Sequence, residues 1–146
     1  MTLANLFLGT DSSWLNLAIL IGRLFIGICF VVHGLGKLGV VGSGNMKGFE
    51  SWLASLNVPA PALQARLAMT FELAGGSMIG LGLFMRLGCL MCVATMAVAA
   101  LIGHKGGGYL ITNNPPGNEY TINLAAVCVM LFLLGPGVYS LDALLF

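Results

Sequence analysis

Long uncharged stretches dominate this chain and restrict the folds open to it. Four of them, 14–36, 63–85, 87–103 and 120–139, are almost wholly apolar. A helix needs about 20 such residues, with a range of about 17–25, to cross a bilayer. Charged residues make up 8% of the sequence, against about 25% in a typical soluble domain. So little charge cannot cover a water-facing surface, and we expect an integral membrane protein.

The four stretches also fix the expected architecture. Backbone groups in lipid must bond within their own segment, which selects helices. We therefore predict an all-α fold, a four-helix transmembrane bundle forming a single domain over 1–146. Between the first two spans, FESWLASLN has apolar residues at helical spacing but is too short to span. It predicts a short amphipathic helix lying at the interface, with Trp52 as its aromatic anchor.

The distribution of basic residues predicts where the chain is located. Arg86 alone separates the second and third spans, whereas the opposite side carries Lys37, Lys47, Arg66 and Lys105. The positive-inside rule then places both long connectors in the cytoplasm of a multi-pass inner-membrane protein. No base precedes the first apolar run, so we expect no cleavable signal peptide. The bases form no stripe for nucleic acid, so the expected partner is the lipid bilayer.

Glu72 is the only charge between Ala68 and Gly82, and it needs compensation inside a membrane. Arg23 lies near the middle of the first span. If the centres of these antiparallel spans are near 25 and 74, the two side chains differ in depth by about 6 Å, which an arginine can cover. We predict an Arg23–Glu72 pair inside the bundle. Such a pair either pins the helix register or lines a proton or quinone site.

Several motifs resemble the DoxX family of small four-helix membrane proteins. They cover nearly the whole chain in order. One departure is Met85, where the family often has threonine. The motifs are RLFIGICFVVHGLGK at 23–37, WLASLNVPAP at 52–61, FELAGGSMIGLGLFMR at 71–86, GNEY at 117–120 and GPGVYSLD at 135–142.

The resemblance implies redox chemistry, because some members resemble membrane subunits of quinone-linked oxidoreductases. We therefore expect a subunit of such an enzyme, with quinone as its cofactor, a protein partner from the redox complex, and room for a homo-oligomer. Arg23, Glu72 and Glu119 are the candidate catalytic residues. His33, Lys37 and His104, near span ends on one membrane side, are candidates for binding the quinone head group. The alternative is that these lysines and histidines are ordinary interfacial residues.

Other interpretations are also open at this point. A non-catalytic scaffold that assembles a redox complex fits the glycine-rich helices equally well, and a small proton pathway is a third candidate. Cys89-Leu-Met-Cys92 has dithiol spacing, but it lies in an apolar helix where cysteine also serves for packing. The two histidines show no ligand spacing, so we expect no metal or haem.

Overall fold

The computed structural model describes residues 12–146, and the regular secondary structure in that range is all helical, with no strand in it. The predicted all-α fold is confirmed. The expectation about a signal peptide concerns residues 1–11, which lie outside the described part. The helices are α2 (Ser12–Leu38), α3 (Met46–Ser55), α4 (Pro61–Leu81), α5 (Met85–Val98) with its π-helical extension η1 (Ala99–Gly103), α6 (Glu119–Leu134) and α7 (Leu141–Leu145).

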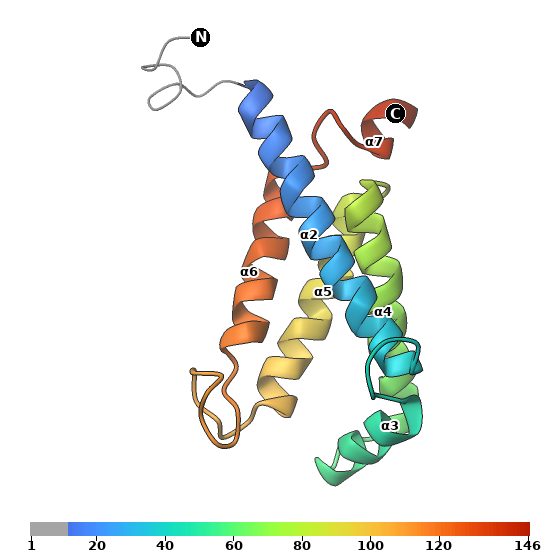
Figure 1. Ribbon diagram of the computed structural model, residues 1–146, viewed down its shortest axis with the longest axis vertical. Coiled ribbons are helices and arrows are strands. Elements are labelled where there is room, and N and C mark those ends of the chain that lie inside the picture. The colour runs from blue at the N-terminus through green and yellow to red at the C-terminus, as the bar shows by residue number, and fades with distance from the viewer. Residues whose placement is uncertain (1–11) are drawn as a thin grey trace.

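Four long helices run up and down beside one another (Figure 1). Helix α2 packs along α4, α4 against α5, and α5 against α6, which returns to contact α2. The short helix α3 lies at one end of this bundle, together with the connector 104–118. We call this the Lys37 end. The opposite end carries the α4–α5 turn and α7, and we call it the Asp142 end.

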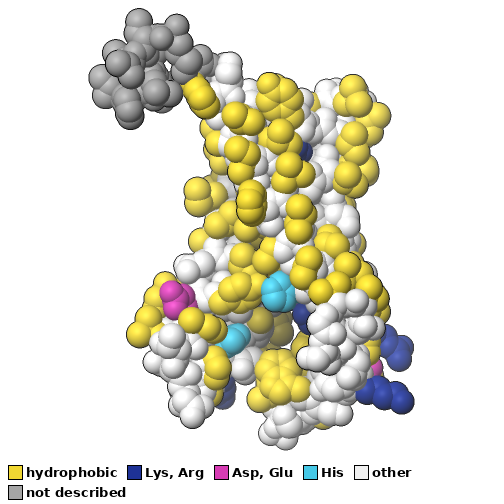
Figure 2. Space-filling view, in the orientation of Figure 1, with side chains coloured by type: hydrophobic (Ala, Val, Ile, Leu, Met, Phe, Trp, Pro, Cys, Tyr) yellow, Lys and Arg dark blue, Asp and Glu magenta, His cyan; other side chains and the backbone are white. Residues whose placement is uncertain are grey.

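On the face drawn in Figure 2, hydrophobic side chains cover the middle and upper part of the bundle, and charged side chains are mostly at the lower end. Phe25 and Leu101 are each 74% exposed, which suits contact with acyl chains. Within residues 12–146, two helical segments are long and apolar enough to cross a membrane, Ser13–Leu38 and Met85–Gly103. Helix α6 is apolar but has 16 residues. Helix α4 is long enough, but Gln64, Arg66 and Glu72 make it less apolar.

Glycine and proline set the ends of these helices. Pro61 occupies the first turn of α4, where its missing N–H costs nothing. Gly82 ends α4 in a left-handed conformation with φ 67°, so α4 ends before the expected limit of the second span at Met85. Gly135 (φ 80°) and Pro136 end α6 short of the expected limit at Tyr139.

Asp142 closes the turn between α4 and α5 from a distant part of the sequence. Its carboxylate accepts the backbone N–H groups of Phe84, at 2.7 Å, and Met85, at 3.1 Å. The Asp142 N–H in turn donates to the Gly82 carbonyl at 2.8 Å. Helix α5 has no side-chain cap of its own. The C-terminal segment therefore caps α5 and neutralises its positive N-terminal end.

Glycines let α2 and α4 approach until their backbones touch. A Cβ built on Gly27 would lie 2.7 Å from the Gly76 carbonyl oxygen and from the Cα and N of Gly80. One built on Gly76 would lie 2.8 Å from the Gly27 carbonyl oxygen. These contacts are with backbone atoms, which cannot move aside. We call Gly27, Gly76 and Gly80 the glycine seam; it fixes which α2 residue is level with which α4 residue.

Replacing Gly27 with alanine is expected to separate α2 from α4 and destabilise the protein by about 2 kcal/mol or more. Gly22→Ala is the matched control on the same helix, because its Cβ would meet only the Leu131 side chain at 3.5 Å. It should leave stability unchanged or raise it by up to about 1 kcal/mol through helix propensity. Thermal unfolding in detergent measures both. Equal melting temperatures for the two variants would contradict the seam.

Gly82→Ala is expected to be strongly destabilising, because its Cβ would overlap the Arg23 guanidinium and lie 2.6 Å from the Ser140 Cβ. The left-handed backbone alone does not explain such a loss. Gly42→Ala tests this, since Gly42 has a similar φ of 71° with nothing within 4 Å of a Cβ. It should cost only about 1 kcal/mol. A similar loss in both variants, again by thermal unfolding, would mean that conformation and not crowding is responsible.

Candidate functional site

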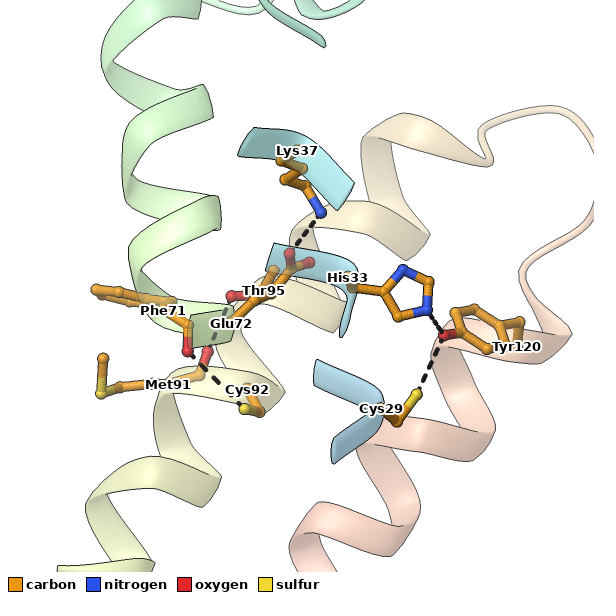
Figure 3. Close-up of polar contacts among 9 residues, drawn as sticks. All are labelled: Cys29, His33, Lys37, Phe71, Glu72, Met91, Cys92, Thr95 and Tyr120. Atoms are coloured by element: carbon orange, nitrogen blue, oxygen red, sulfur yellow. Dashed lines mark hydrogen bonds and ion pairs between the residues drawn. The ribbon is translucent and has the colours of Figure 1, made fainter. Parts of the chain in front are cut away.

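The buried charge Glu72 is compensated by Lys37. The Lys37 Nζ lies 2.5 Å from Glu72 Oε2, with side-chain exposures of 18% and 4%. Lys37 comes from the last turn of α2 and Glu72 from the middle of α4 (Figure 3). The same ammonium lies 5.0 Å from the centre of the Phe49 ring on α3. An ion pair and a cation–π contact thus join three helices at one point.

The predicted Arg23–Glu72 pair is wrong, and the glycine seam explains why. We took positions 25 and 74 as level, but Gly27 lies against Gly76 and Gly80. In the same register Leu73, the neighbour of Glu72, lies beside Gly34. Gly34 is 11 residues from Arg23 along α2. At 1.5 Å per residue, Arg23 and Glu72 are about 16 Å apart along the bundle. No arginine side chain covers that distance.

Arg23 instead lies at the Asp142 end. It is 1% exposed and donates a hydrogen bond from Nη2 to the Tyr139 carbonyl. Its Nε and Nη1 have no hydrogen-bond partner among the described residues. The guanidinium lies against Gly82 and Ser140. Arg23 therefore holds the segment after α6 against the α4–α5 turn, and it is not part of the Lys37 site.

A second polar contact lies beside the ion pair. His33 Nε2 and the Tyr120 hydroxyl share a hydrogen bond, and their ring centres are 5.6 Å apart (Figure 3). Cys29, one turn before His33 on α2, has its Sγ 3.6 Å from the same hydroxyl. The Tyr120 hydroxyl thus lies between an imidazole and a thiol. This arrangement can pass a proton between α6 and α2.

A pocket opens between α2 and α3 next to these groups. Its volume is about 590 Å³, and His33 and Lys37 both line it. Val32, Val41 and Phe49 supply apolar walls. We call it the α2–α3 pocket. The connector 41–45, with Ser43 and Asn45, completes the lining. The pocket thus combines apolar side chains with a few polar groups, a composition that suits a small molecule.

The remaining predicted site residues are not in this pocket. His104 lines a separate hollow, and its Nδ1 lies 3.1 Å from the Pro116 carbonyl. Glu119 accepts the backbone N–H of Ile111 at 3.1 Å and so closes the connector 104–118. The structure therefore brings together His33, Lys37 and Glu72, but it places Arg23, His104 and Glu119 elsewhere.

Sequence reasoning missed Tyr120 and Cys29. A signal was available, since Cys29 and His33 are four residues apart and must share a face of α2. Tyr120 belongs to the GNEY motif, but its distance along the sequence from α2 hides its contact with His33. The buried thiols of Cys89, Cys92 and Cys128 belong to the apolar core and are free. Within residues 12–146, no three His, Cys, Asp or Glu side chains are placed to hold a metal ion.

Lys37→Met alone is expected to destabilise the protein by about 3–5 kcal/mol, because it leaves the Glu72 carboxylate buried without its partner. The double variant Lys37→Met/Glu72→Leu should recover most of this loss, since an apolar pair can replace a buried ion pair. Thermal unfolding of the purified protein measures both. A double variant as unstable as the single one would contradict the pairing.

The chain is similar to known membrane proteins. The DoxX family model matches residues 18–105. Inner membrane protein YphA of Escherichia coli strain K12 is 28% identical over 130 residues, which cover 85% of this chain and 87% of that protein. No solved structure matches. The family model covers more than half of the residues and confirms the resemblance seen in the motifs, so this chain belongs to the DoxX family of membrane proteins.

Proposed function

We propose that this chain is the quinone-binding subunit of a membrane oxidoreductase, and that the quinone binds in the α2–α3 pocket. The observation that carries the proposal is the Lys37–Glu72 ion pair, whose ammonium also lines an apolar pocket. A quinone ring is flat and apolar, with carbonyl oxygens as acceptors. Lys37 has three N–H donors, of which Glu72 uses one. The others are available to a carbonyl.

The residues around the pocket also suit the proton side of the reaction. Reduction of a quinone to a quinol takes two electrons and two protons. Glu72 is buried beside Lys37, and the His33–Tyr120 hydrogen bond reaches the pocket wall from α6. The Glu72 carboxyl and the His33–Tyr120 pair can each carry a proton. A rotation of these side chains would bring either group to a quinone bound in the pocket. The electrons would come from an electron-donating partner protein of the same complex.

The proposed setting is the inner membrane, with all four long helices crossing it. The name of the Escherichia coli relative supports this location. A chain that spans the membrane would accept the quinone sideways from the lipid, which is where quinones dissolve. The alternative proposal is a scaffold that assembles a redox complex without binding quinone. In mild detergent a scaffold should still co-purify with one partner in a fixed ratio.

The test is titration calorimetry of the purified protein in nanodiscs with a short-chain benzoquinone. Wild type is expected to bind. Lys37→Met/Glu72→Leu should weaken binding by about tenfold or more, since a hydrogen bond from a charged donor contributes about 1.5–3 kcal/mol. The double variant is used because it keeps the buried site neutral and the protein folded.

Lys47→Met is the matched control, because Lys47 is exposed on α3 and does not line the pocket. Its affinity for the quinone should equal that of wild type. Absence of binding to wild type would favour the scaffold, particularly if a partner co-purifies. Equal affinity of wild type and the double variant for the quinone would show that the quinone binds at a site without Lys37.

A further inference from the structure

A second, larger hollow opens at the Lys37 end, between the end of α3 and the end of η1. Its volume is about 830 Å³. Figure 2 shows a hollow at this lower end of the molecule. We call it the α3–η1 groove. Its walls are mostly apolar and include Trp52, Leu56, Val58, Leu101, Ile102 and Pro116.

Trp52 lies directly on the end of η1. A Cβ built on Gly103 would be 2.9 Å from the Trp52 ring, so the glycine makes this close packing possible. Trp52 also stacks on Phe49, with ring centres 5.8 Å apart and an angle of 20°. These contacts fix the wall that α3 contributes. The shape of the groove on this side is therefore set by the packing of Trp52 against Gly103 and Phe49.

The ionisable side chains that line the groove are all basic. Lys105 and His104 line it, and none of its lining residues is Asp or Glu. Lys105 is exposed and forms no ion pair within residues 12–146. The Pro116 carbonyl accepts from His104 Nδ1, which leaves Nε2 for a ligand. The groove thus combines apolar walls with a cation that is not neutralised by the protein.

The depth of the groove in the bilayer follows from its position on the chain. Gly103 ends a segment apolar enough to cross a membrane, Met85–Gly103. If Met85–Gly103 crosses the membrane as proposed, Lys105, two residues beyond its end, comes to the level of the head groups, with Leu101 and Ile102 on the acyl-chain side. Lys47 and Arg66 belong to the same end of the bundle. Basic residues gather on the side of a membrane that presents anionic lipids to them.

We propose that the α3–η1 groove is a binding site for an anionic phospholipid. One acyl chain lies along Trp52, Leu101 and Ile102, and the phosphate binds to the Lys105 ammonium. An acyl chain matches the apolar walls, and an anionic head group supplies the charge that the groove lacks. This site is separate from the α2–α3 pocket, and the proposal does not depend on quinone binding.

The fluorescence of Trp52 can report the occupant of the groove. The chain has two tryptophans, Trp14 and Trp52, so Trp14→Phe leaves Trp52 as the only one. This variant is placed in nanodiscs that contain phosphatidylglycerol and phosphatidylcholine, with brominated acyl chains on one lipid at a time. Brominated phosphatidylglycerol is expected to quench Trp52 more strongly at equal mole fraction. The preference should be about fivefold, the usual effect of one lysine near an anionic surface.

Three substitutions in the Trp14→Phe background assign the preference to Lys105. Lys105→Gln should abolish it, Lys105→Arg should keep it, and Lys47→Gln should leave it unchanged, because Lys47 does not line the groove. Equal quenching by both lipids would overturn the proposal, as would a preference that survives Lys105→Gln. Loss of lipid quenching on addition of a benzoquinone would assign the groove to quinone and overturn it as well.

Discussion

The contact between α2 and α4 at the glycine seam determines how the charges of these two helices are placed relative to each other. Gly27 meets Gly76 and Gly80 with no side chain between the helices. Because backbone meets backbone there, sliding one helix along the other by a turn would force side chains into the seam. This register brings Glu72 level with the last turns of α2, where Lys37 is the available cation. It also brings Arg23 level with the α4–α5 turn.

The Lys37 site depends on this register and on α3 together. Lys37 contacts Glu72 on α4 and the Phe49 ring on α3, so the interfacial helix is tied to the buried charge. Asn45 caps α3 by accepting the Gly48 N–H at 2.8 Å, which fixes where the helix begins. A change of charge at Glu72 would therefore act on α3 as well as on the pocket. The pocket and the interfacial helix form one unit.

The sequence was sufficient for the fold but not for the pairing of charges. Long apolar stretches predict that the helices exist, but not where they end: α4 and α6 stop at Leu81 and Leu134, before the expected limits at Met85 and Tyr139. The partner of Glu72 depends on the depth of each helix, and midpoints of apolar stretches locate depth only to within a few turns. Helical spacing puts Gly27 on the same face of α2 as Arg23 and Lys37, and Gly76 and Gly80 on the Glu72 side of α4, so facing glycine surfaces can be predicted. The pattern does not show that Gly27 is level with Gly76 and Gly80, and this register decides the pairing. The cap that Asp142 provides for α5 is likewise a contact between distant segments that local patterns do not contain.

The two cations of α2, Arg23 and Lys37, are accommodated in different ways, and the difference bears on which of them a ligand can reach. Arg23 is 1% exposed, bound to a main-chain carbonyl and packed against Gly82, so no small molecule can reach it without opening the Asp142 end. Lys37 retains 18% side-chain exposure and borders an open pocket. Replacing Arg23 should therefore act on stability, whereas replacing the Lys37–Glu72 pair should act on binding. An intramembrane charge marks a functional site only where a ligand can approach it, and in this bundle that condition favours the Lys37 end.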